Sequence, residues 1–258
     1  MANTLTRFWQ EGNLSRKPYI HCEDVETLAT RPSFPASRSF EEYLVGKSFG
    51  PKDNWFDFSL YPVPYAGDLE KAKVVILGLN PGLTYSDYWA EFKVRSFRER
   101  LERNLDQNFK GIDFPFMFLD PQFCWNSGFQ WWERKLRNIV IRIASKGRNG
   151  SYYDALRFLS KRLACIELIP YHSASFSDQK LIRELPSAKD ARSFVQERLV
   201  PKAGSGKITI IVTRQQEGWG IEKNSKNICV YGSGQARGAS LGEKTDGGEA
   251  ILKQLQIN

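Results

Sequence analysis

The chain has 258 residues, of which 41% are hydrophobic and 26% are charged, which is long enough for one α/β domain with a full core. No stretch reaches the roughly 20 apolar residues of a membrane span, and the N-terminus lacks the apolar run of a signal peptide, so we predict a cytoplasmic protein. Lys and Arg exceed Asp and Glu by 37 to 29, a formal net charge of +8 that favours a polyanionic partner such as nucleic acid or an acidic membrane surface.

The cysteines carry no metal-binding pattern. They lie far apart in the sequence without a C-x-x-C pair, at Cys22, Cys124, Cys165 and Cys229. Zinc and iron–sulfur sites need closer spacings, so we predict no metal, no other cofactor and no disulfide. Cys165 and Cys229 lie in apolar runs and are expected to be buried thiols.

The first 70 residues differ in composition from the rest. They are rich in proline, aromatic and turn-forming residues, with short helical candidates near 21–30 and 39–46. We predict that residues 1–70 form an N-terminal segment that wraps around an α/β domain of residues 71–258, the whole chain being a single domain.

From residue 71 on, strands and helices alternate. The sequence KVVILGL at 73–79 is a continuous apolar run, typical of a strand buried on both faces. A helix is expected over 86–105, and an amphipathic, basic helix over 131–146. The later elements are helix 152–163, strand 164–170, helix 189–202, strand 207–213, strand 227–232 and helix 246–256. This order predicts a three-layer α/β sandwich with a central, mostly parallel four-stranded sheet.

Unusual residues follow the ends of these strands, and parallel strands bring such loops to one edge of the sheet. Asn80 begins an Asn-Pro-Gly turn after the first strand, His172 follows the second, and a Gly/Ser loop with Arg237 follows the last. Each feature alone is common in purely structural roles: a turn, a hydrogen-bonded histidine, a connector. Their convergence at one edge favours a functional site.

The run GLNPGL at 78–83 resembles the first motif of the uracil-DNA glycosylase superfamily, nearest its mismatch-specific and thymine-DNA glycosylase branch, whose pattern is Gly-Ile-Asn-Pro-Gly-Leu. The resemblance covers about residues 71–92, extends to the order of elements over 150–258, and is absent from the first 60 residues. Phe92 lies twelve residues after Asn80, the spacing at which the family stacks the extruded base.

The resemblance implies a monofunctional DNA glycosylase that flips a nucleotide out of duplex DNA and leaves an abasic site. Asn80 would orient the attacking water, where faster members of the family carry Asp. Backbone N–H groups at the turn would stabilise charge on the departing base. The implied substrate-binding residues are Gly78, Leu79, Pro81, Gly82, Phe92, Glu167 and Ser173.

Two positions depart from the uracil enzymes. Gly82 stands where uracil-specific members carry a Tyr that blocks substituents at C5 of the base, so a bulky group could enter. Glu167 aligns with the Asn that reads the pyrimidine edge, although it could instead pair with an arginine. A carboxylate accepts a hydrogen bond from N4 of cytosine. We therefore expect a C5-modified cytosine as substrate, such as the glucosylated hydroxymethylcytosine of phage DNA. Candidates for contacting the substituent are Ser173 with the other polar residues of its loop, and the aromatic segment 123–132.

The last loop also differs from the family, which usually shows His-Pro-Ser or Asn-Pro-Ser there. The residues expected to bind DNA in this loop are Ser233, Gly234, Gln235 and Arg237. Gln235 or Arg237 would fill the space left by the flipped nucleotide, or both would be solvated. Without the usual His, either His172 stabilises the departing base as a second catalytic residue or the activity is lost.

The sequence thus predicts a monomeric enzyme of antiviral defence that acts on double-stranded DNA without metal or cofactor. Three alternatives stay open. The first is a uracil or G:T and G:U mismatch glycosylase of base excision repair. The second is a DNA-binding module that kept the fold without the chemistry. The third is a nucleoside or nucleotide hydrolase, which would have an acidic or neutral surface around its site.

Overall fold

The structure is a computed structural model that describes residues 3–51, 54–147, 150–222, 226–236, 238 and 240–257. It divides into two compact units, and neither is a continuous stretch of the chain. Unit 1 consists of Met1–Tyr65, Leu79–Asn108 and Glu167–Phe194, and unit 2 of Ala66–Gly78, Phe109–Ile166 and Val195–Asn258.

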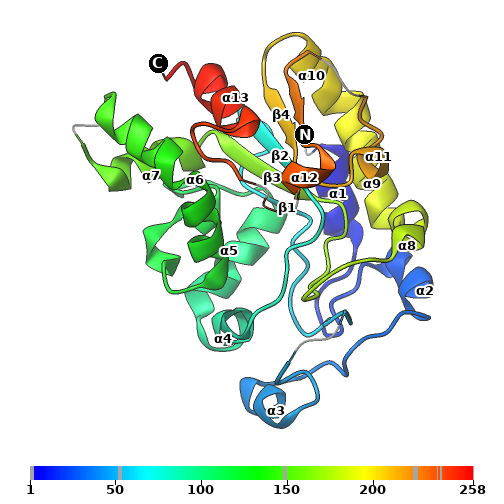
Figure 1. Ribbon diagram of the computed structural model, residues 1–258. Coiled ribbons are helices and arrows are strands. Elements are labelled where there is room, and N and C mark those ends of the chain that lie inside the picture. Colours follow the sequence, from blue (N-terminus) through cyan, green and yellow to red (C-terminus); the bar gives the residue numbers. More distant parts are fainter. Residues whose placement is uncertain are drawn as a thin grey trace. The chain divides into compact units, whose positions relative to one another are not determined.

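The sheet has five strands in the order β1-β3-β2-β4-β5, and β2 pairs in parallel with β4, as β4 does with β5 (Figure 1). The bounds are Tyr65–Ala66 for β1, Val74–Gly78 for β2, Leu163–Glu167 for β3, Thr209–Val212 for β4 and Ile228–Val230 for β5. The α/β class and the mostly parallel sheet are confirmed, but the expected number of four strands is wrong. The additional strand β1 has two residues, too few to show an apolar period in the sequence.

The main core of unit 2 lies on one face of the sheet. The register aligns Ile76 with Ile211 and Ile211 with Cys229, and because aligned residues of parallel strands share a face, this row faces one set of helices. These helices are α6 (Ser127–Ser145), α7 (Tyr152–Ser160) and α13 (Asp246–Leu255). In Figure 1, α6 and α7 (green) lie side by side. Cys165 is buried in this core, as expected, whereas Cys229 is half-buried.

Other elements of unit 2 fix the end of β2 that precedes the Asn-Pro-Gly turn. The Thr213 hydroxyl donates to the Leu77 carbonyl (2.9 Å), and the indole N–H of Trp219 donates to the Gly78 carbonyl (3.1 Å). The Gly78 carbonyl is therefore bound by Trp219 and helps to hold the end of β2 in place. The remaining elements of unit 2 are η2 (Met117–Leu119), η3 (Pro121–Phe123), the π-helical η4 (Val195–Leu199), α10 (Val200–Gly204), α11 (Gln216–Trp219) and α12 (Ser233–Ala236).

Unit 1 is helical and rich in connecting segments. Its helices are α1 (Thr4–Glu11), η1 (Cys22–Asp24), α2 (Val25–Leu28), α3 (Phe40–Val45), α4 (Tyr85–Lys93), α5 (Arg95–Leu105), α8 (Gln179–Glu184) and α9 (Pro186–Phe194). The expected helix over 86–105 is two helices, because Val94 has extended backbone angles (φ −109°, ψ 92°). The expected helix over 189–202 is likewise divided, into α9, η4 and α10. The apolar pattern continues through both breaks, so it could not reveal them. None of the described helices has the length and apolar character to cross a bilayer.

The stability of unit 2 should depend strongly on Ile211, which is 0% exposed on β4, between β2 and β5. Ile211→Ala leaves a cavity and should lower the free energy of unfolding by about 2–5 kcal/mol, against about 0.5–1.5 kcal/mol for Ile211→Val. Urea denaturation measures both. Ile141→Ala on α6, where the side chain is 51% exposed, is the control and should change the value by less than about 0.5 kcal/mol. Equal losses of unfolding free energy in Ile211→Ala and in the control would contradict the burial of Ile211 in this core.

Candidate functional site

The Asn-Pro-Gly turn leads directly into α4. Leu79 is buried and its carbonyl accepts from the Ile169 N–H (2.8 Å), which ties the start of the turn to the segment after β3. Thr84 and Asp87 form a capping box, in which the Thr84 N–H donates to Asp87 (2.7 Å), so that α4 begins at the next residue. The turn is therefore fixed at both ends, and Pro81 between them is half-buried.

Asn80 is oriented by Ser173. Its Nδ2 atom donates to the Ser173 carbonyl (3.1 Å) and to the Ser173 hydroxyl oxygen (3.3 Å), and Ser173 is 0% exposed. The Ser173 hydroxyl in turn donates to the Ser175 carbonyl (2.9 Å). Within the described ranges no hydrogen bond engages the Asn80 Oδ1 atom, and the residue is half-buried. The amide is thus held through its donor side, which leaves its acceptor side for a ligand.

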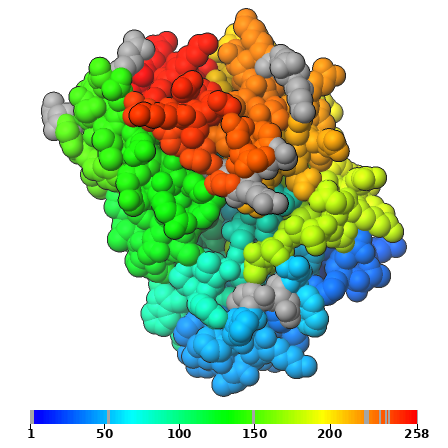
Figure 2. Space-filling model, viewed as in Figure 1, coloured from blue at the N-terminus to red at the C-terminus, as the bar shows by residue number. Residues whose placement is uncertain are grey.

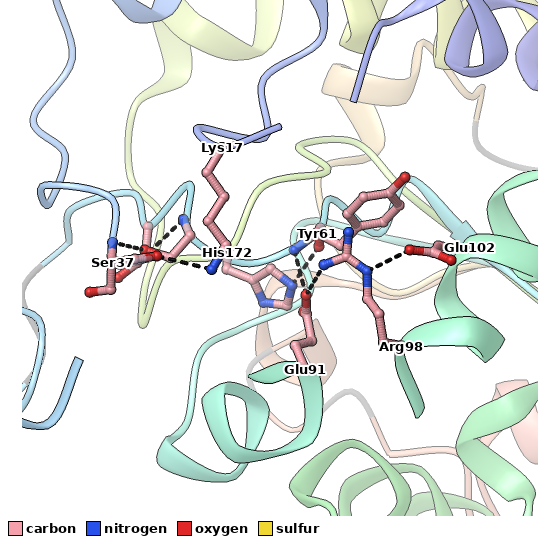
Figure 3. A network of polar contacts seen from close by, with 9 residues as sticks. Lys17, Ser37, Tyr61, Glu91, Arg98, Glu102 and His172 are labelled. Carbon is pink, nitrogen blue, oxygen red and sulfur yellow. Dashed lines mark hydrogen bonds and ion pairs between the residues drawn. The ribbon is translucent and has the colours of Figure 1, made fainter. Parts of the chain in front are cut away.

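His172 bridges two backbone carbonyl groups. Its Nδ1 lies 2.8 Å from the Gly82 carbonyl oxygen. Its Nε2 lies 3.0 Å from the carbonyl oxygen of Tyr61, and Figure 3 shows both residues. The ring is 6% exposed. Because carbonyl oxygens only accept, a ring nitrogen that carries a proton donates to the carbonyl it faces. The sequence suggested a catalytic role for His172, but this geometry favours a positioning role that holds the Asn-Pro-Gly turn.

Gly82 leaves open space beside the turn. Its φ of +73° lies in the left-handed region, and a Cβ atom built there meets no heavy atom within 4 Å. Glycine is therefore favoured here by the backbone conformation and not by crowding. Whether a C5 substituent of a base enters at this position stays a prediction.

One face of Phe92 is covered by a cation. The Lys17 Nζ atom lies 3.4 Å from the centre of the Phe92 ring and donates to the Ser37 carbonyl (2.9 Å). Burial lowers the Lys17 pKa from 10.5 to about 8. Phe92 otherwise packs at the edge of a small aromatic and aliphatic cluster. A base that stacked on the covered face would have to displace Lys17.

Next to Phe92, the side chain of Glu91 is 4% exposed and lies inside a polar network (Figure 3). Its Oε2 accepts from the Tyr61 N–H (2.8 Å) and lies 3.4 Å from an Arg98 nitrogen. Arg98 also bonds to Glu102 (2.9 Å) and lies over the Tyr61 ring. Burial, its largest influence, raises the Glu91 pKa from 4.5 to about 8. Groups that titrate near neutrality in a buried network are candidates for function.

A second buried carboxylate supports the same region. Asp57 is 1% exposed, accepts from the Tyr88 hydroxyl (2.6 Å) and from the Ser59 N–H (2.8 Å), and its own N–H donates to the His172 carbonyl (3.0 Å). Burial, followed by the charge of Asp57, raises the pKa of Tyr88 far above its usual value. This network keeps the backbone of His172 in place.

The sequence did not single out four charged residues of these networks, namely Lys17, Asp57, Glu91 and Arg98. Glu91 directly precedes Phe92 on a predicted helix, which was an available signal. No signal in the sequence marked Lys17, because its burial arises from contacts with Ser37 and Phe92, which are far away in the sequence.

Glu167 and the residues of the last loop have contacts of their own. Glu167 ends β3, is half-buried, and its N–H donates to the Pro64 carbonyl (2.9 Å). In the last loop, residues 233–236 form the helical turn α12, and the exposed Gln235 donates to Asp246 (3.0 Å). Gly234 is exposed, with open space around its Cα. The side chain of Ser233 and all of Arg237 lie outside the described residues.

The raised pKa of Glu91 predicts a pH-dependent stability. The folded protein keeps the proton up to about pH 8, whereas the unfolded chain releases it above about pH 4.5. The free energy of unfolding should therefore fall between these values, by roughly 1 kcal/mol per pH unit. Glu91→Gln still accepts from Tyr61 and should flatten this slope in urea titrations at pH 5 to 8. Lys17 affects the free energy of unfolding only above about pH 8. There the folded protein has lost the Lys17 proton and the unfolded chain still holds it, so the free energy of unfolding rises with pH up to 10.5.

Glu99→Gln is the matched control, since Glu99 lies on α5 with a side chain that is 53% exposed and pairs with Arg95. This variant should keep the slope of the unaltered protein. An unchanged slope in Glu91→Gln would show that Glu91 ionises normally in the folded state.

No set of three or more His, Cys, Asp and Glu side chains is placed to hold a metal ion among the described residues. The chain matches no family model, no curated protein and no solved structure.

Proposed function

We propose that the protein is a monofunctional DNA glycosylase that removes a base and leaves an abasic site. The observation that carries this proposal is the orientation of Asn80, whose Nδ2 atom is bound twice by Ser173. Its Oδ1 atom then accepts a hydrogen bond from a water molecule and directs the lone pair of that water at the sugar carbon. An amide does this without ionising, so no general base with a shifted pKa is needed at this position.

The turn supplies the second requirement of the reaction, which is stabilisation of the departing base. As the bond to the sugar breaks, negative charge builds on the base and positive charge on the sugar. Backbone N–H groups in a fixed turn stabilise such charge without reorganising. The capping box at Thr84 and the bridge from His172 to the Gly82 carbonyl both hold this turn.

The proposed substrate is cytosine with a bulky substituent at C5, such as the glucosylated hydroxymethylcytosine of phage DNA. The open space beside Gly82 supports this choice, because no heavy atom lies within 4 Å of a Cβ atom built there. Glu167 would accept a hydrogen bond from N4 of cytosine. If Glu167 is protonated in the complex, it donates to N3 and eases the departure of the base.

The net charge of +8 supports a DNA partner. We propose that the protein acts as a monomer on double-stranded DNA in the cytoplasm, in defence against phages. A uracil or mismatch glycosylase of the same superfamily fold would share the Asn80 chemistry and differ only in the base that it admits.

A DNA-binding module without catalytic activity is the second candidate. It is favoured by one observation, the engagement of both His172 nitrogens by backbone carbonyls. A ring whose two nitrogens both face backbone carbonyls has neither nitrogen left for a departing base, and the last loop lacks the family's usual His. In this case the protein would bind DNA and release no base. A nucleoside or nucleotide hydrolase, the third class, fits the basic composition less well.

Asn80→Ala should lower single-turnover base excision by a factor on the order of 100, while the affinity for DNA changes little, because the lost interaction acts mainly in the transition state. Ser173→Ala removes one of the two acceptors and keeps the Ser173 carbonyl, so its loss should be smaller, about ten-fold. Single-turnover kinetics and DNA binding measure the two effects separately. Full activity in Asn80→Ala would remove Asn80 from the mechanism.

The substrate is tested with duplexes that contain uracil, thymine opposite guanine, cytosine, 5-hydroxymethylcytosine or its glucosylated form. Abasic sites are revealed as strand breaks after alkali treatment. We expect cleavage at the modified cytosines. Cleavage at uracil alone would overturn the substrate and keep the glycosylase, whereas tight binding without any cleavage would favour the second candidate.

A further inference from the structure

A cluster of cations surrounds the last loop within unit 2. Lys135 of α6 donates from Nζ to the Gly238 carbonyl, and Arg214, just after β4, donates from Nε to the Ala236 carbonyl (3.3 Å). Arg134 is the neighbour of Lys135 on α6 and is exposed. In Figure 2 the green surface of α6 adjoins the orange-red surface of the last loop. Elements far apart in the sequence thus place positive charge around one loop.

The charge of this cluster is not neutralised. Across the described part of the chain, no carboxylate forms an ion pair with Arg134, Lys135 or Arg214. Arg137, one turn further along α6, instead makes two hydrogen bonds to Glu133 (2.9 and 2.8 Å). Burial lowers the pKa of Lys135, and the charges of Arg134 and Arg214 lower it further. Like charges kept together without a counter-ion are typical of a surface that binds phosphate.

An exposed indole belongs to the same surface. Trp131 lies one helical turn before Lys135, whose Nζ is 5.3 Å from the indole ring centre. The ring is held edge-on by the buried Trp132, with 4.8 Å between their centres, yet 38% of Trp131 remains exposed. A large aromatic surface in water next to unpaired cations is a combination that binds unpaired bases and their phosphates.

We propose that Trp131, Arg134, Lys135 and Arg214 form a binding site for single-stranded DNA, in which a base stacks on Trp131 and the flanking phosphates contact the three cations. A single strand fits better than a duplex because a paired base has both of its faces covered by neighbouring bases. The site shares no residue with the Asn80 turn and does not depend on base excision.

Stacking is tested with two fluorescently labelled strands of equal length, one of thymidine nucleotides and one of abasic nucleotides. Trp131→Leu should weaken binding of the thymidine strand about ten-fold or more and leave binding of the abasic strand nearly unchanged, since loss of base stacking is expected to have this size. Trp125→Leu is the matched control, because Trp125 is 37% exposed and should have no effect. Trp131→Phe keeps a smaller ring and should lie in between, and thermal melting confirms that each variant folds.

The charges are tested by the salt dependence of binding to the thymidine strand. Arg134→Gln and Arg214→Gln should each reduce the slope of log affinity against log salt by about 0.7, the value for one phosphate of a single strand. Arg137→Gln removes the same charge from the same helix at a position paired with Glu133. It should leave the slope unchanged.

Several results would overturn the proposal. These are equal effects of Trp131→Leu and Trp125→Leu, equal affinity of the unaltered protein for the two strands, or equal slopes in all three arginine variants. A duplex whose binding depends on Trp131 as strongly as that of the single strand would overturn the choice of a single strand. None of these measurements uses base excision, so a protein that removes no base can still pass them.

Discussion

Both ring nitrogens of His172 lie within hydrogen-bonding distance of backbone carbonyl oxygens, and the turn that carries Asn80 depends on this bridge. The turn has little regular secondary structure to satisfy its polar groups, so buried side chains must do so. His172 engages the Gly82 and Tyr61 carbonyls, and Glu91 accepts from the Tyr61 N–H. One histidine and one carboxylate therefore connect the turn, helix α4 and the segment around Tyr61 into a single polar framework.

This framework explains why the charges near the candidate site are buried. A carboxylate in a dry environment is costly unless it is neutral or paired, and Glu91 has a raised pKa and an arginine beside it. Lys17 meets the same difficulty differently, by placing its ammonium group over the Phe92 ring and against the Ser37 carbonyl. The polar groups that fix the backbone thus also make the site sensitive to protonation.

Local sequence patterns predicted those parts of the fold that depend on local periodicity. The strands β2, β3 and β4 were evident because a strand buried on both faces must be apolar at successive positions. Strand β1 has too few residues to show a pattern, and the break at Val94 interrupts the backbone of a helix without interrupting its apolar period. The connections after β2 and β3 were expected to lie together, and Asn80 does contact Ser173. Lys17 could not be found in this way, because its contacts join distant segments.

The empty space next to Gly82 has a consequence for synthesis. A side chain on an ordinary L-residue is disfavoured there by the φ of +73° and not by any neighbouring atom. A D-residue prefers this half of the backbone map, and its side chain points in a different direction from the one that was tested for an L-residue. Chemical ligation could therefore introduce D-alanine at position 82 to restrict the unfolded chain. D-alanine would keep the backbone conformation of the turn while adding a methyl group to it. The variant would therefore test the role of the conformation separately from the role of the open space.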